Sequence, residues 1–134
     1  MEIVMIASEA RPYAMTGGLA DVVSSLSVAL SERGDKVTVI VPYHKQKMKK
    51  FTGELTVKVS PLSFKFDGRT EHAQILEIKK NSRLTYLFVE YNRYFDRPSL
   101  YDWNGIEYGD NAERFIFFCR AAMHTIVELG IHPD

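Results

Sequence analysis

The chain has 134 residues, which is enough for one domain with a hydrophobic core and short for two, so we expect a single domain over residues 1–134. Its 17 basic and 17 acidic side chains cancel, which gives no electrostatic sign of a nucleic-acid partner, and 46% apolar residues exclude a disordered chain. No apolar run approaches the roughly 20 residues of a membrane span, and the start lacks a secretory signal, so the cytoplasm is the expected location.

The first 42 residues carry the pattern of a strand, a helix and a second strand. Residues 2–8 (EIVMIAS) are almost all apolar, which is typical of a parallel strand buried on both faces. Apolar side chains from Leu19 to residue 33 have helical spacing, and Gly34 is placed to end that helix. Residues 36–42 are rich in β-branched side chains, so the whole predicts a right-handed βαβ unit with parallel strands.

A cluster of basic residues follows the second predicted strand. Without aromatic residues between the charges, two interpretations stay open: a loop that attracts phosphate or polyanions, and a solvated connection. The cluster consists of His44, Lys45, Lys47, Lys49 and Lys50.

The middle of the chain predicts a β-hairpin and a return to the main sheet. Residues 55–59, 62–66 and 73–78 alternate as half-buried antiparallel strands do, with Asp67-Gly68 as a turn. Residues 84–89 form a second continuous apolar run. We therefore expect an α/β fold of three layers, Rossmann-like, with a mostly parallel sheet and the hairpin insertion to one side.

The last third predicts a loop followed by a helix. Residues 91–109 contain many Gly, Pro, Asn and Asp residues, so we expect no regular structure there, and loops of this length are often functional. Asp110 is placed to cap the last helix, with Glu113 at the reciprocal position and Gly130 at the end. The single cysteine, Cys119, cannot form an intrachain disulfide, and we expect it to be a small buried apolar side chain rather than a nucleophile.

Two adjacent glycines, Gly17 and Gly18, stand where the first strand gives way to the first helix. A helix N-terminus carries unpaired amides and a partial positive charge, and glycines let a phosphate approach them. The site would lie at the carboxyl end of a strand, where open α/β sheets bind ligands. The pair matches neither common phosphate-binding motif, so a glycine turn without a ligand is the alternative. Asp21 either complements the helix dipole or binds sugar hydroxyls.

Three segments carry a resemblance to a known family. Residues 6–44, which contain SEARPYAMTGGLADV, resemble the amino terminus of bacterial glycogen synthases and plant starch synthases, the family 5 glycosyltransferases. Residues 94–105 (YFDRPSLYDWNG) and 109–122 (GDNAERFIFFCRAA) are similar to the same amino-terminal domain. The resemblance covers the whole chain.

The resemblance implies a GT-B enzyme, in which two Rossmann-like halves face each other across a cleft. Such an enzyme transfers glucose from ADP-glucose or a related nucleotide sugar to the nonreducing end of an α-1,4-glucan, with retention of configuration. We therefore expect a nucleotide sugar and an α-glucan as partners, and neither an organic cofactor nor a metal ion.

The resemblance also implies roles for individual residues. Asp21 and Glu9 are the candidate catalytic residues: Asp21 would bind sugar hydroxyls, and Glu9 would support the same cleft. Tyr94 and Phe95 would line the cleft, although ordinary packing is the alternative for them and for Glu9. The implied substrate-binding residues are Met15, Thr16, Gly17, Gly18, Asp21, Tyr94, Phe95, Asp96, Asp110 and Asn111.

Two departures from the family pattern leave three hypotheses open. Met15 stands where the family has a lysine that faces the nucleotide sugar, and residues 1–134 stop before the family's His-Asp-Trp segment and its carboxy-terminal domain. The chain is therefore part of a synthase that needs this missing domain or a separate subunit, a non-catalytic module that binds glucan or sugar phosphate, or a generic α/β domain. Alone, we expect it to be inactive and, because the sheet is incomplete, to form at least weak homodimers.

Overall fold

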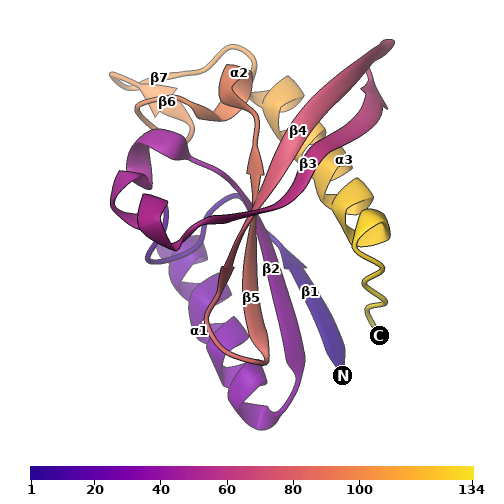
Figure 1. The fold of residues 1–134 in the computed structure, drawn as a ribbon. Helices are drawn as coiled ribbons and strands as arrows, with labels where there is room; N and C mark the ends of the chain where they lie inside the picture. Colours follow the sequence, from indigo (N-terminus) through magenta and orange to yellow (C-terminus); the bar gives the residue numbers. More distant parts are fainter.

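The structure is a computed structural model that describes residues 1–134. A five-stranded sheet forms the centre of its fold (Figure 1). The strands lie in the order β1-β2-β5-β4-β3, in which β1, β2 and β5 are parallel and the β3–β4 hairpin is antiparallel. The expected α/β fold is confirmed, and the hairpin extends the same sheet beyond β5. The strands are β1 (Glu2–Ile6), β2 (Lys36–Pro42), β3 (Thr56–Phe66), β4 (Arg69–Lys79) and β5 (Leu84–Glu90).

The predicted βαβ unit is confirmed, because helix α1 (Gly18–Arg33) connects β1 with the parallel strand β2. The helix begins directly behind Gly17, so its amino terminus lies at the carboxyl end of β1. It ends at Gly34, whose φ of 109° is in the left-handed region that favours glycine. Gly34 thus fixes where this helix stops.

The second long helix, α3 (Asn111–Glu128), lies on the other face of the sheet, so the fold has three layers (Figure 1). Alternate residues of a strand point to opposite faces, and β2 shows this directly. Ile40 packs in the cluster that contains α3 residues, whereas Val39 and Val41 pack in the cluster that contains Val23 of α1. Burial on both faces explains the continuous apolar runs of β2 and β5.

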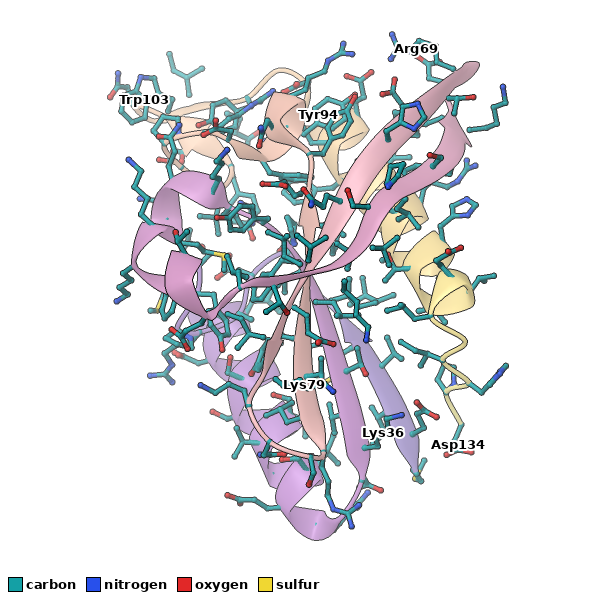
Figure 2. The ribbon with its side chains drawn as sticks, viewed as in Figure 1. Lys36, Arg69, Lys79, Tyr94, Trp103 and Asp134 are labelled. Atoms are coloured by element: carbon teal, nitrogen blue, oxygen red, sulfur yellow. The ribbon has the colours of Figure 1, made fainter.

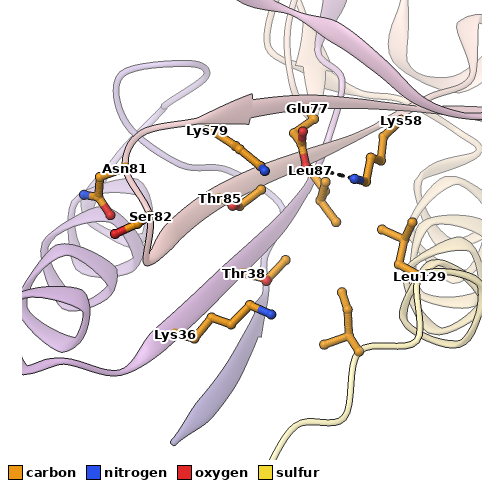
Figure 3. Close-up of a pocket in the computed structure, with 11 residues that line it drawn as sticks. Lys36, Thr38, Lys58, Glu77, Lys79, Asn81, Ser82, Thr85, Leu87 and Leu129 are labelled. Atoms are coloured by element: carbon orange, nitrogen blue, oxygen red, sulfur yellow. Dashed lines mark ion pairs between the residues drawn. The ribbon is translucent and has the colours of Figure 1, made fainter.

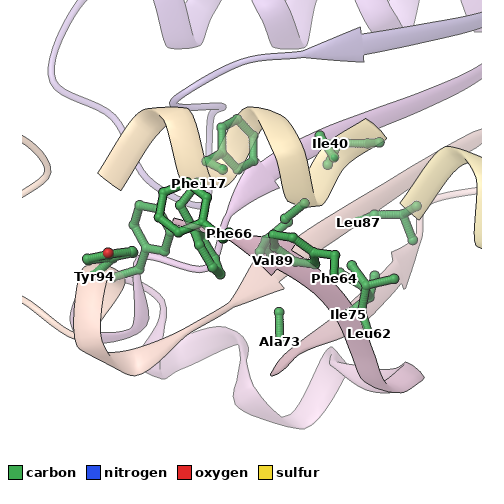
Figure 4. Packing of buried hydrophobic residues seen from close by; sticks show 14 residues of the cluster. Ile40, Leu62, Phe64, Phe66, Ala73, Ile75, Leu87, Val89, Tyr94 and Phe117 are labelled. Carbon is green, nitrogen blue, oxygen red and sulfur yellow. The ribbon is translucent and has the colours of Figure 1, made fainter. Parts of the chain in front are cut away.

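Aromatic side chains fill the core beneath α3 (Figure 4). Phe117 lies at the centre of this cluster, with its ring centroid 5.2 Å from those of Phe64, Phe66 and Tyr94. Aromatic pairs at this separation contribute about 0.5–1.5 kcal/mol each beyond the area that they bury. The packing joins the hairpin, α3 and the segment after β5 into one body.

Two short helices of 3-10 type follow β2, namely η1 (Lys45–Lys47) and η2 (Lys49–Glu54). The segment after β5 is also structured, so the expectation of no regular structure over residues 91–109 is wrong. It forms a helical turn, α2 (Asn92–Phe95), and a small hairpin of β6 (Asp102–Trp103) and β7 (Ile106–Glu107). Asn104-Gly105 at its tip has positive φ at both residues, as a two-residue hairpin turn requires.

Two expectations about α3 are wrong. Cys119 is exposed, because its position in the helix points away from the sheet. The helix begins beside Asp110 as expected, but the Asp110 carboxylate makes no capping hydrogen bond. It instead accepts two hydrogen bonds of 2.7 Å from the guanidinium of Arg97, which is a stronger donor than a backbone amide. No helix of the fold is both long and apolar enough to cross a membrane.

Candidate functional site

The loop that joins β1 to α1 is tightly folded over residues 8–17. Ala10 and Ala14 exchange two backbone hydrogen bonds of 3.0 Å, which turns the chain back on itself. Tyr13 is buried within this turn, with its ring centroid 4.9 Å from that of Tyr86 and 5.1 Å from that of Phe88. The turn is therefore anchored on β5 and carries Met15, Thr16 and Gly17 to the surface.

Glu9 is buried beneath this loop, and both of its carboxylate oxygens accept hydrogen bonds. Oε1 accepts from the backbone amides of Thr16 (3.0 Å) and Gly17 (3.3 Å). Oε2 accepts from the hydroxyls of Thr16 (2.9 Å) and Tyr101 (2.5 Å). Burial alone would raise the pKa of Glu9, but these donors outweigh it and lower the pKa. Glu9 is thus ionised at neutral pH. Its hydrogen bonds hold the loop of residues 8–17, which we call the glycine loop.

The amides at the start of α1 remain available to a ligand. Gly18 and Leu19 are exposed, and their amides have no backbone acceptor within the protein, as expected for the first turn of a helix, whereas the next residue, Ala20, is fully buried. Neither Gly17 nor Gly18 has a positive φ, and a Cβ atom at either position would meet no other atom within 4 Å. Neither backbone strain nor internal packing therefore requires glycine at these two positions.

Asp21 and Met15 both lie at the surface next to these amides. The Asp21 carboxylate is about half exposed and forms an ion pair of 2.6 Å with Arg11. A carboxylate in the first turn also complements the helix dipole. Met15 is 49% exposed, so a longer cationic side chain would fit at this position without displacing the core.

The structure places the two expected cleft aromatics in the core. Tyr94 and Phe95 are each 1% exposed, and they pack with Phe117 and Phe118 of α3. Their side chains therefore contact the protein interior and do not line an open surface. Asp96, the next residue, is exposed and accepts a hydrogen bond of 3.1 Å from the side chain of Gln46.

Arg114, which the sequence analysis did not single out, organises the segment between β5 and α3. Its fully buried guanidinium donates to the carbonyls of Tyr94 (2.8 Å) and Leu100 (2.9 Å) and to Oδ1 of Asn111 (2.8 Å). Burial lowers the pKa of Arg114 to about 10, so it stays charged at neutral pH. Asn111 also donates to the carbonyl of Tyr101 at 2.9 Å, which makes its amide part of the same scaffold.

Tyr101 is a second residue that the sequence analysis missed. Its hydroxyl donates to Glu9, and the hydroxyl of Ser8 lies 2.7 Å from it. Burial and the Glu9 carboxylate raise the pKa of Tyr101 to about 12. The residue precedes β6, so it joins the small hairpin to the glycine loop. Only its place inside the matched motif at 94–105 hinted at such a role.

His44 differs from the rest of the basic cluster to which it was assigned. It is 2% exposed, and its Nε2 donates to the carbonyl of Ser8 at 2.8 Å. Burial lowers its pKa to about 4, so it is neutral at pH 7. The prediction that His44 adds to the basic character of the loop is wrong, because an unpaired charge in the core would cost too much free energy.

A separate cavity of about 290 Å³ lies at the other end of the parallel strands (Figure 3). Figure 2 shows Lys36 and Lys79, which line it, far from Tyr94 and Trp103. Two of its three lysines already have acidic partners: Lys36 pairs with Glu2 at 3.2 Å, and Lys58 pairs with Glu77 at 3.9 Å. None of the predicted site residues lines this cavity.

Comparison with known proteins assigns the family. A sequence model described as the starch synthase catalytic domain matches residues 2–134. The chain belongs to this family. It is 39% identical over 137 residues to a glycogen synthase of Elusimicrobium minutum, covering 100% of this chain and 27% of the relative. It is 38% identical over 134 residues to a glycogen synthase of an Anaeromyxobacter strain, covering 99% of this chain and 27% of that relative.

A solved structure agrees with this assignment. The catalytic domain of starch synthase IV from Arabidopsis thaliana, bound to ADP and acarbose, has a TM-score of 0.74 and 31% sequence identity, and the match covers 98% of this chain and 26% of that one. The chain thus spans about a quarter of the length of the relatives that it matches. Membership of the family rules out a generic α/β domain.

Proposed function

We propose that this chain forms part of an α-glucan synthase that transfers glucose from ADP-glucose to the nonreducing end of an α-1,4-glucan, with retention of configuration. The observation that carries the proposal is the start of α1, where the exposed, unpaired amides of Gly18 and Leu19 lie at two glycines that the fold itself does not require. The similar starch synthase IV domain is bound to ADP and acarbose, that is, to a nucleotide and a glucan-like sugar, and this supports the proposal.

In this proposal the residues of the loop act together. The amides behind Gly17 and Gly18 face the donor phosphates, and Thr16 and Met15 flank them. Glu9 acts by holding the loop, because both of its oxygens are already engaged by protein donors. Asp21 accepts hydrogen bonds from sugar hydroxyls once its exposed pair with Arg11 opens, which costs little at the surface.

The second half of the reaction site is proposed to lie outside residues 1–134, in a carboxy-terminal domain or a separate subunit. Catalysis requires reacting groups to be held from both sides of a cleft at once. We therefore propose that residues 1–134 alone do not elongate glucan. Of the implied residues at the start of α3, Asp110 and Asn111 act by fixing the scaffold, since their side chains are bound to Arg97, Arg114 and Tyr101.

A second candidate function is favoured by Met15 alone. A module that binds glucan or sugar phosphate without transferring glucose has no need of a cation at this position. The two functions differ in one measurable property, which is transfer of the sugar.

The test uses the full-length gene product, labelled ADP-glucose and glycogen. We expect glucose to be incorporated, and we expect Asp21→Ala to reduce incorporation at least tenfold. Glu32→Ala is the matched control, because Glu32 is an exposed acid in the last turn of the same helix and should leave the rate unchanged. Binding of glycogen without incorporation would favour the second function, and the absence of both would refute each of them.

A further inference from the structure

Four lysines after β2 form an exposed positive patch, which we name the lysine patch and define as Lys45, Lys47, Lys49 and Lys50. Three of the side chains are exposed and that of Lys45 is partly so. None of the four takes part in an ion pair, although ion pairs occur in most other parts of the fold. Residues 45–50 therefore carry four positive charges that no acidic side chain neutralises.

The segment that carries the lysine patch is fastened to the glycine loop and to the segment after β5. Before it, His44 donates to the carbonyl of Ser8 at 2.8 Å. Within it, Gln46 donates to Asp96 at 3.1 Å, and the side chain of Met48 is fully buried. The connection is thus no freely solvated loop, although its sequence alone allowed that interpretation.

A ring contact after the patch fixes its position relative to the glycine loop. Phe51, which directly follows Lys49 and Lys50, has its ring centroid 4.9 Å from that of Tyr13. Tyr13 stands two residues before Met15 in the folded loop, and Figure 1 shows η2 beside this loop, at the same end of the sheet as the start of α1. The segment that carries the unpaired charges therefore packs against the loop that precedes α1.

We propose that the lysine patch is the cationic flank of the donor site and attracts the phosphate groups of the nucleotide sugar. This inference rests on the proposed function and deepens it, because it assigns the positive charge that Met15 does not supply to a different segment. A group of like charges near a low-dielectric surface raises the local concentration of an anion and speeds its association, and salt screens the effect over about 10 Å. No bond is made or broken by these lysines.

The test measures binding of ADP to the full-length gene product by calorimetry at low and high ionic strength. For the double variant Lys47→Glu/Lys49→Glu we expect binding about tenfold weaker at low salt, with the difference falling to about twofold at 0.5 M salt. The matched control is Lys79→Glu/Lys80→Glu, which reverses two exposed charges at the far end of the sheet and should change binding less than twofold.

The outcomes separate this inference from the proposed function. If the unaltered protein binds ADP and the Lys47→Glu/Lys49→Glu variant binds it equally well, the lysine patch has no such role while the proposed function stands. An equal loss in the control variant would also overturn the inference, since it would show an effect of net charge alone. Failure of the unaltered protein to bind ADP would refute both.

Discussion

Met15 is exposed beside the free amides of α1, at a position where the family resemblance implies a lysine. An ammonium placed here would make a charge-assisted contact with a phosphate, worth about 1.5–3 kcal/mol, or roughly 10-fold to 150-fold in affinity or rate. We therefore expect Met15→Lys in the full-length gene product to raise incorporation of glucose from ADP-glucose at least tenfold, as measured with labelled donor.

The control for this prediction is Met123→Lys, which adds the same charge to an exposed methionine on α3. It should leave the rate unchanged. The unaltered protein could instead be highly active and gain nothing from Met15→Lys. That result would contradict the assignment of this loop to the donor phosphates, or would show that the lysine patch already supplies the charge. Combining Met15→Lys with Lys47→Glu/Lys49→Glu separates these two cases, because only in the second does lysine restore lost activity.

His44 makes the stability of the fold depend on pH. Its pKa is lowered from 6.5 to about 4 by burial, so between these values the unfolded chain binds a proton that the folded chain does not. Stability from this group is thus fully present above pH 6.5 and is lost as the pH falls toward 4, by on the order of 3 kcal/mol in total. We expect the urea midpoint to fall between pH 7 and pH 5, where few carboxylates titrate.

The matched variant is His44→Gln, whose amide can still donate to the carbonyl of Ser8 but does not titrate. It should show a flatter dependence of the urea midpoint on pH in the same range. A slope equal to that of the unaltered protein would mean that His44 is not the group responsible.

Burial of single polar residues was the part of the site that sequence could not predict. His44 and Glu9 stand in polar stretches, and only the folded chain shows that each is 2% exposed with its hydrogen bonds made internally. Cys119 is the opposite case, because it stands in an apolar stretch and yet faces solvent. In a helix of mixed composition, the packing of neighbouring elements decides which residues face the core. The periodicity of the sequence alone fixes this poorly.

Among the elements, the β6–β7 hairpin exposes two large apolar side chains. Trp103 and Ile106 face each other across its two strands and are 52% and 74% exposed. Tyr94 and Phe95 are buried, so Trp103 is the aromatic ring that remains available to the apolar face of a sugar. We expect Trp103→Ala to weaken binding of a maltooligosaccharide about tenfold or more, as truncation of an exposed anchor does.

Affinity electrophoresis in glycogen gels measures this loss, and thermal unfolding checks that the fold is intact. Ile116→Ala is a suitable control, because Ile116 is an exposed apolar residue on α3. Unchanged mobility of the Trp103→Ala variant in the gel would contradict a role for this hairpin in glucan binding.

Elements with strong local signals were predicted well from sequence, whereas elements that depend on distant residues were not. Helix α1 and strands β2 and β5 follow from apolar spacing and from Gly34, and all lie where expected. The structure of residues 91–109 depends instead on Arg114, whose guanidinium binds carbonyls 14 and 20 residues earlier in the chain. The Asn104-Gly105 turn was the one local signal of a hairpin there.

At the scale of the whole molecule, the three layers follow from strands that are apolar on both faces. The sheet has two different edges, however. At one edge of the sheet lies β3 of the β3–β4 hairpin. At the other edge lies β1, which pairs only with β2. The expectation that the sheet is incomplete stays a prediction, because every open sheet has two end strands, and here they are β1 and β3.

The open edge of β1 is only partly covered. The backbone amide of Asp134 donates to the carbonyl of Glu2 at 2.9 Å, and the Asp134 carboxylate accepts from the amide of Glu2 at 2.6 Å, so the chain's last residue lies beside the start of the strand. Ala7 donates to β2, and the alternation of a parallel ladder then points the amides of Val4 and Ile6 to the open edge. Such an edge is a template for pairing with another chain.

We therefore expect residues 1–134, studied alone, to self-associate weakly between micromolar and millimolar concentration, as measured by sedimentation equilibrium. Ile6→Lys should weaken the association at least tenfold, because Ile6 is 41% exposed at the end of this edge and a lysine there opposes strand pairing. Val127→Lys, on the exposed surface of α3, replaces an apolar residue away from the edge and should leave the association unchanged. A monomer at every concentration, or equal loss in both variants, would show that the edge of β1 does not mediate it.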